Sequence, residues 1–234
     1  MIVVKIDLKG AIVTDGQKHI YNWLEIPAVA PKDIKDALPE SNEDVELIVN
    51  SNGGIVNSGS EIYTMLKEYP GKVTAKVVGM AASAASVVVM AADTVQISPT
   101  ARIMIHNAWS SAEGDHRAME TAKESVTSAD KGIRNAYMQK TNLSEEEITE
   151  LMNKETYMDA EKAVELGFAD EIMFQNKPID VAASLEGGLL PESIIDKVRN
   201  VMLREEKNQS NDILKRKALM EKELKIEEIE NSLK

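Results

Sequence analysis

Predicted strands and helices alternate along residues 1–174 of this chain, which has 234 residues in all. Segments rich in β-branched residues and bounded by turn formers predict strands over 2–6, 45–51, 72–79, 94–98, 101–105 and 169–174. A leading proline predicts a helix over 31–38, apolar spacing predicts one over 61–69, and Ala-rich composition predicts one over 80–93. This alternation is typical of parallel strands covered by helices, so the predicted class is α/β.

Three further helices are predicted after residue 115. From His116 to Lys140 the apolar residues recur three or four positions apart, as on one face of a long amphipathic helix. A second helix begins at Ser144, which can act as N-cap with Glu147 as its capping-box partner. A third follows Asp159 as N-cap and ends at Gly167.

The end of the chain differs in composition from the rest. Residues 175–203 are rich in Gly, Pro, Ala and Ser and predict a linker with a short helix. Residues 204–234 carry 8 acidic and 8 basic residues and predict a charged helical or partly disordered tail. The formal net charge of −12 therefore belongs to residues 1–203. We expect one body over 1–174, followed by this extension.

Composition excludes several classes of protein. The chain has no Cys, which excludes a disulfide scaffold, a zinc-thiolate site and a Cys nucleophile. A net charge of −12 without basic clusters argues against nucleic-acid binding. No apolar segment reaches the roughly 20 residues of a spanning helix, and no secretory leader opens the chain. We expect a cytoplasmic protein with neither a nucleic acid nor a membrane as partner.

Few residues are candidates for chemistry. Of the three His residues, His19 and His116 are predicted to lie on the surface, and His106 lies where a strand ends and a loop begins. Ser83 follows a strand at the first turn of the Ala-rich segment, where a hydroxyl can lie beside free backbone N–H groups. Each signal also has a purely structural interpretation. His106 can be a structural residue whose hydrogen bonds are satisfied, and Ser83 can be a helix N-cap or part of a helix-packing surface.

A glycine turn, SNGG, ends the predicted strand 45–51. Glycines there allow a backbone N–H to approach a ligand closely, as an oxyanion hole requires, although an ordinary tight turn has the same composition. A phosphate loop is disfavoured because neither GxGxxG nor GxxxxGK[ST] is present.

Three motifs occur together in an order and spacing that resemble one family. They are SNGGIVNSGSEIYTML, VVGMAASAASVVVMAAD and SPTARIMIHNAW. The chain resembles the ClpP family of serine peptidases, which have a crotonase-like α/β fold, over about residues 1–174. It looks most like the ClpP-like head maturation (prohead) proteases of tailed phages and prophages, which share a short N-terminus and an ETYM-like segment.

The resemblance implies a role for four residues of this chain. Ser83 matches the nucleophile and His106 the general base, while Gly54 and Ala84 match the residues whose amides form the oxyanion hole. A backbone N–H serves whatever its side chain is, so Ala84 is acceptable where degradative members often have Met.

The third member of the triad is the point at which this sequence departs from the family. Glu155 stands where degradative ClpP peptidases have Asp, and a Glu can orient a His as an Asp does. Asp159 and Asp170 are the competing acids. Glu155 is favoured because it keeps the register of the segment YMDAEKAVELGFAD.

The activity implied is peptide hydrolysis through an acyl-enzyme, without a metal or cofactor. The family implies a homo-oligomer, expected to be ring-shaped, whose rings stack through the helix 116–140. The subtype implies capsid or scaffold protein as substrate, cleaved in the host cytoplasm or the assembling prohead. The alternatives are a degradative subunit fed by an ATPase partner, a crotonase-like acyl-CoA enzyme, and a non-enzymatic component with a decayed site.

Overall fold

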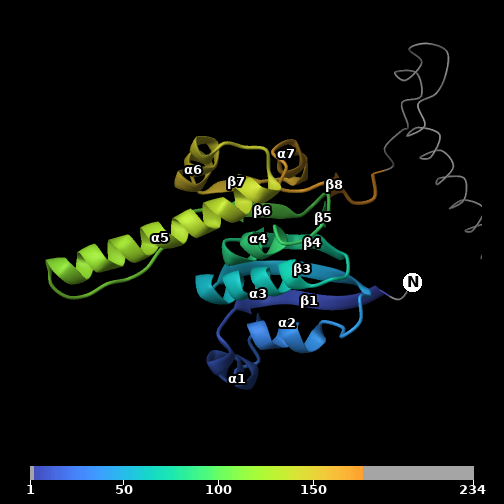
Figure 1. Ribbon diagram of the computed structural model, residues 1–234, viewed down its shortest axis with the longest axis horizontal. Coiled ribbons are helices and arrows are strands. Elements are labelled where there is room, and N and C mark those ends of the chain that lie inside the picture. Colours follow the sequence, from blue (N-terminus) through green and yellow to red (C-terminus); the bar gives the residue numbers. More distant parts are fainter. Residues whose placement is uncertain (1–2, 176–234) are drawn as a thin grey trace, which may run out of the picture. The chain divides into compact units, whose positions relative to one another are not determined.

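A computed structural model describes residues 3–175 of the chain (Figure 1). The predicted linker and tail, 175–203 and 204–234, lie outside the described residues except for residue 175. None of the helices in the described range is both long and apolar enough to cross a membrane.

Eight strands form one sheet in the described part of the chain. They are β1 (Val3–Ile12), β2 (Ala28–Val29), β3 (Asp44–Gly54), β4 (Val73–Ala82), β5 (Thr94–Ile97), β6 (Arg102–Ile105), β7 (Thr156–Met158) and β8 (Glu171–Ile172). The main order is β2-β1-β3-β4-β5-β8, and β6 pairs with β4 and β7. All pairs are parallel except β6 with β7. This confirms the predicted α/β class.

Seven helices connect and cover these strands within the same range. They are α1 (Asp15–Trp23), α2 (Pro31–Ala37), α3 (Val56–Glu68), α4 (Ala84–Val89), α5 (His116–Lys140), α6 (Glu145–Asn153) and α7 (Ala160–Glu165). Figure 1 shows α5 projecting well beyond the strands. The predicted bounds of α5 are confirmed, as are the N-caps Ser144 and Asp159, whose side chains accept backbone N–H groups of α6 and α7.

The Ala-rich segment 80–93 differs from its prediction as one buried helix. Residues 80–82 continue β4 and pair with β6, with Met80 opposite Arg102 and Ala82 opposite Met104. The helix α4 begins only at Ala84. Pairing with a neighbouring strand has overridden the helix propensity of the alanines, as tertiary context often does. The consequence is a turn between Ala82 and Ala84, with Ser83 at its apex.

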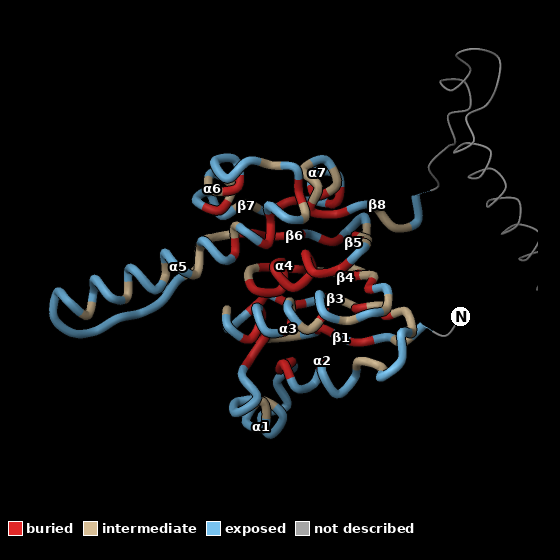
Figure 2. The backbone as a smooth tube through the Cα atoms, in the orientation of Figure 1, coloured by how far each residue is buried: buried red, intermediate tan, exposed pale blue. Residues whose placement is uncertain are grey.

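The core lies between the sheet and the helices that pack on it. Figure 2 shows buried residues concentrated in β1, β3, β4 and β5 and in α4, whereas the projecting part of α5 is mostly exposed. Every residue of α4 is buried. On the α5 side, the rings of Tyr137 and Phe168 meet edge to face with centroids 5.5 Å apart. Thus α5 is anchored to the core near its C-terminal end.

Phe168 offers a test of this anchoring. The side chain is fully buried, so replacing it by Ala should lower the free energy of unfolding by about 3–5 kcal/mol through lost burial and the cavity left behind. Phe174, which is 89% exposed, is the matched control, and its replacement by Ala should change stability by less than about 0.5 kcal/mol. Urea denaturation at one protein concentration measures both. Equal losses would contradict the packing described.

Candidate active site

Ser83 occupies the sharp turn between β4 and α4. Its backbone has φ 53° and ψ −127°, a conformation that costs a non-glycine residue about 1–3 kcal/mol. The turn is held by β6, because the Ser83 N–H donates to the Met104 carbonyl at 3.0 Å. A strained strand-to-helix turn of this kind projects a serine hydroxyl away from the backbone, as in the nucleophile elbow of α/β-hydrolases.

His106 lies directly after β6, the strand that pairs with the end of β4. Parallel pairing brings the carboxyl ends of the two strands to the same edge of the sheet. There His106 Nε2 lies 2.7 Å from Ser83 Oγ. With the ring proton on Nδ1, Nε2 accepts the Ser83 hydroxyl proton. The structure therefore joins the two residues that the sequence singled out as nucleophile and base.

The segment that follows His106 is fixed by two helices. The Ala108 N–H donates to Asp130 Oδ1 of α5 at 2.7 Å. The Asn107 side-chain amide donates to Asn153 Oδ1, the last residue of α6, at 2.8 Å. These contacts hold in place the segment that leads away from His106.

The glycine turn at the end of β3 packs against the serine turn. A Cβ on Gly53, which has φ +90°, would lie 2.7 Å from Ser83 Cβ and 2.9 Å from the Ala84 nitrogen. A Cβ on Gly54, which has φ +152°, would lie 2.1 Å from the Ile12 carbonyl oxygen. The buried Ser51 hydroxyl steadies the turn by accepting the Gly53 N–H at 3.0 Å. Neither glycine can therefore carry a side chain here.

These residues border a cleft of about 710 Å³. Gly54, Ser83, Ala84 and His106 all line it. Ala84 is the first residue of α4, so its N–H has no acceptor within that helix. One wall is apolar, with Val87 of α4, Met104 of β6, and Val126, Ile133 and Tyr137 of α5. The cleft thus combines a hydroxyl paired with an imidazole, two backbone amide positions and an apolar surface for a side chain.

Glu155 directly precedes β7, and His106 directly follows β6. The antiparallel pairing of these strands ends with Thr156 opposite Ile105, and Glu155 lies in the turn before it with φ 51°. The Glu155 side chain is nevertheless exposed, and its Oε1 accepts from the Tyr157 hydroxyl at 3.3 Å. Within the described residues, the His106 ring hydrogen-bonds only to Ser83. Glu155 therefore flanks the strand that pairs with β6, but within the described residues no hydrogen bond joins it to the imidazole.

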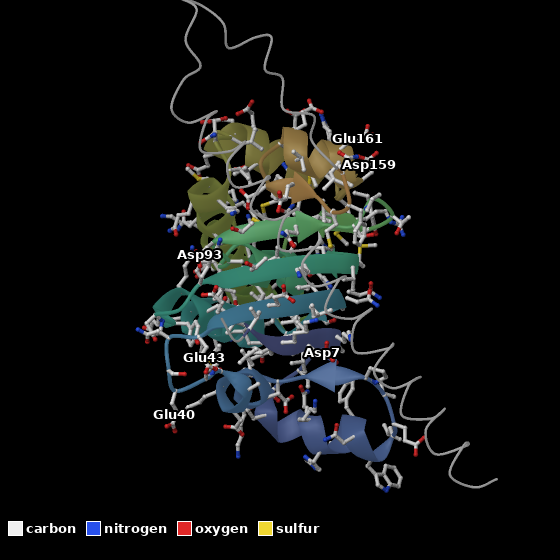
Figure 3. The ribbon with its side chains drawn as sticks, turned by 90° about the vertical axis from the view of Figure 1, so that its right-hand side faces the viewer. Asp7, Glu40, Glu43, Asp93, Asp159 and Glu161 are labelled. Atoms are coloured by element: carbon white, nitrogen blue, oxygen red, sulfur yellow. The ribbon has the colours of Figure 1, made fainter. Side chains whose placement is uncertain are left out.

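The two competing acids are engaged elsewhere. Asp159 caps α7 by accepting the Lys162 N–H at 2.8 Å, and it lies with Glu161 on the outer surface (Figure 3). Asp170 Oδ2 accepts the Val95 N–H at 2.6 Å and pairs with Lys140 Nζ at 2.8 Å. Both carboxylates thus have structural partners, and neither hydrogen-bonds to His106.

Several residues around the site were missed by the sequence analysis. Asp130 and Asn153, which hold the segment after His106, gave no signal because their partners lie 22 and 46 residues away in the chain. Ser86 and Tyr137 were missed too, although both are almost fully buried beside the serine turn. The one hint in the sequence was Tyr137 itself, because its hydroxyl is a polar group on the otherwise apolar face of the predicted helix 116–140.

Comparison with known proteins gives a consistent assignment. A family model described as Clp protease matches residues 37–176. Two curated relatives, from two strains of Dehalococcoides mccartyi, are each named ATP-dependent Clp protease proteolytic subunit. Each is 29% identical over 136 residues, which cover 57% of this chain and 68% of the relative.

A solved structure shares the fold. It is a ClpP1 mutant from Listeria monocytogenes, which aligns with a TM-score of 0.61 at 21% identity. The alignment covers 74% of this chain and 92% of that one. The family match spans more than half of the chain and includes the serine turn, His106 and Glu155. The chain therefore belongs to the Clp protease family of serine peptidases.

Proposed function

We propose that this protein is a serine endopeptidase that uses Ser83 as nucleophile and His106 as general base. The observation that carries the proposal is the 2.7 Å contact between Ser83 Oγ and His106 Nε2 in the lining of a cleft that also has apolar side chains. A serine hydroxyl is activated as a nucleophile when a general base lies within hydrogen-bond distance of it.

The reaction proceeds through an acyl-enzyme. Ser83 Oγ attacks the scissile carbonyl carbon while His106 Nε2 takes the hydroxyl proton, and the imidazolium then gives a proton to the leaving amine. The Gly54 and Ala84 N–H groups stabilise the oxyanion of the tetrahedral intermediate. Water then attacks the acyl-enzyme with the same base, which releases the acid product and restores Ser83.

Glu155 completes the proposed triad. Glu155 and His106 each flank the last residue pair of β7 and β6, so we propose that rotation of the Glu155 side chain away from Tyr157 brings its carboxylate to His106. There it would hold the imidazole in the productive tautomer and stabilise the imidazolium.

The biological role that we propose is processing of capsid or scaffold protein during phage head maturation, in the host cytoplasm or the prohead. It is supported by the ETYM segment, residues 155–158, and by the charged extension after the peptidase body. Co-expression with the capsid and scaffold proteins of a phage or prophage from the same genome tests this role. Site-specific cleavage of either protein is the expected result, and intact capsid and scaffold proteins would contradict it.

A degradative role is the second candidate, since the curated relatives are named as proteolytic subunits of an ATP-dependent protease. The two roles differ in their need for an ATPase partner. A degradative subunit should hydrolyse folded proteins only when a Clp-type ATPase and ATP are added. A maturation protease should cleave its capsid substrate without either.

We further propose that the body, residues 1–174, is the peptidase and that the tail over 204–234 targets it. A chain truncated after Phe174 should fold, assemble and hydrolyse a small peptide ester at the full-length rate, because all the cleft-lining residues that the structure describes belong to the body. Its processing of capsid protein should fall sharply. Size-exclusion chromatography, ester hydrolysis and capsid cleavage measure the three properties.

Two outcomes would contradict this division. An insoluble or monomeric truncated chain would show that the tail is structural. Capsid processing at the full-length rate would show that the tail has no targeting role. Cleavage within the linker 175–203 during maturation would be detected in the full-length chain by intact mass.

A further inference from the structure

Three buried polar groups form a chain of hydrogen bonds behind the nucleophile. The Ser86 hydroxyl lies 2.6 Å from the Ser83 carbonyl oxygen, one turn back along α4. The Tyr137 hydroxyl of α5 lies 2.8 Å from Ser86 Oγ. Ser86 is fully buried and Tyr137 is 1% exposed. The roles proposed so far for Ser83, His106 and the oxyanion amides do not use this pair.

The direction of the chain follows from the number of protons available. A carbonyl oxygen can only accept a hydrogen bond, so Ser86 must donate its single hydroxyl proton to the Ser83 carbonyl. The Tyr137 phenol must then be the donor to Ser86 Oγ. Burial raises the pKa of Tyr137 above its ordinary value, so the phenol keeps this proton at neutral pH. The order is Tyr137 to Ser86 to the carbonyl of Ser83.

The carbonyl at the end of this chain belongs to the most strained residue of the site. Besides the Ser86 hydroxyl, it accepts the Ser86 N–H at 2.9 Å and the Val87 N–H at 3.3 Å. The peptide group that carries this carbonyl also carries the Ala84 N–H, one of the proposed oxyanion donors. Fixing the carbonyl therefore fixes the direction of the Ala84 N–H and the backbone from which Ser83 Oγ projects.

We propose that Tyr137 and Ser86 are positioning residues that hold the Ser83–Ala84 peptide in its catalytic orientation and so couple α5 to the nucleophile. This inference rests on the proposed function of Ser83. A serine hydroxyl that bonds to a carbonyl three residues back is common by itself. The buried donor from another helix distinguishes Ser86, because it fixes the hydroxyl rotor toward the Ser83 carbonyl.

The test compares turnover per active site in three variants. Tyr137→Phe removes the donor while keeping the ring that packs on Phe168, and Ser86→Ala removes the link. Each should lower kcat for a peptide ester by about 10- to 100-fold, the range expected for a small displacement of reacting groups, with KM close to wild type. Fluorophosphonate titration counts active sites, so partial unfolding cannot mimic the loss.

The double variant distinguishes positioning from separate structural effects. Because Tyr137 acts through Ser86, the chain carrying both substitutions should have the kcat of Ser86→Ala alone. Two exposed hydroxyls on α3 provide matched controls: Tyr63, which donates to Gln139, and Thr64, which donates to the Ser60 carbonyl. Tyr63→Phe and Thr64→Ala should retain wild-type kcat.

The outcomes separate this inference from the function on which it rests. Wild-type kcat per titrated site in Tyr137→Phe, or losses that multiply in the double variant, would overturn the positioning role while leaving the peptidase intact. A wild-type chain that neither reacts with the fluorophosphonate nor hydrolyses the ester would overturn the proposed function, and this inference with it.

Discussion

Replacing Ser83 by Ala should reduce peptide-ester hydrolysis at least about a thousandfold, since loss of a triad nucleophile removes the covalent route altogether. That factor corresponds to about 4 kcal/mol of transition-state stabilisation. The protein should still fold, because Ala also fits the turn and the Met104 carbonyl contact is made by the backbone. Initial rates of hydrolysis by equal concentrations of wild-type and variant protein provide the measurement.

Ser98→Ala is a suitable control for this variant. Ser98 is not among the residues that line the cleft, and its hydroxyl contacts only Thr100 among the described side chains. Its replacement should leave the rate unchanged. Full turnover by the Ser83→Ala protein would eliminate the mechanism. Ser86 cannot replace Ser83 as nucleophile, because its hydroxyl is fully buried and hydrogen-bonded at both ends.

Replacing Glu155 by Gln should lower kcat by up to about 10⁴-fold, the effect of the corresponding change in a serine-protease triad. A neutral amide cannot stabilise the imidazolium, and it can hold His106 in the wrong tautomer. Folding should be unaffected because the Glu155 side chain is exposed and, among the described residues, hydrogen-bonds only to the Tyr157 hydroxyl. The measurement is kcat of the assembled protein, compared with Glu161→Gln as an exposed control.

Asp159→Asn is the decisive companion variant. Its side-chain oxygen caps α7, and Asn is as good an N-cap as Asp, so both stability and kcat should stay nearly intact. If Asp159→Asn abolished turnover while Glu155→Gln were nearly silent, the third member of the triad would be misassigned. A silent result in both would leave either Asp170 as the acid or a dyad of Ser83 and His106, and Asp170→Asn would distinguish the two.

Elements with a strong local signal could be predicted from the sequence. The helix α5 was predicted with its observed bounds because apolar residues recur along one face. The caps Ser144 and Asp159 were found because capping depends on residues within three positions. Ser83 and His106 were found through motifs that surround them, and the structure places them in contact.

Elements that depend on distant partners could not be predicted. Residues 80–82 form strand because β6 pairs with them, and the short β7 exists only as a partner of β6. The helix α1 was not predicted. It buries no residue in the core, although the capping contact between Thr14 and Gln17 is a local signal in the sequence. Likewise the Tyr137–Ser86 contact joins residues 51 positions apart. Local sequence patterns do not indicate contacts between residues so far apart in the chain.

The identity of the residue that a fluorophosphonate probe modifies tests the central claim most directly. Ser83 should be the nucleophile because His106 Nε2 lies 2.7 Å from its hydroxyl in the described structure. After labelling of the full-length protein, peptide mapping by mass spectrometry should place one adduct on Ser83. The adduct should be absent from Ser83→Ala and strongly reduced in His106→Ala. No adduct, or an adduct on another serine that persists in Ser83→Ala, would contradict this account.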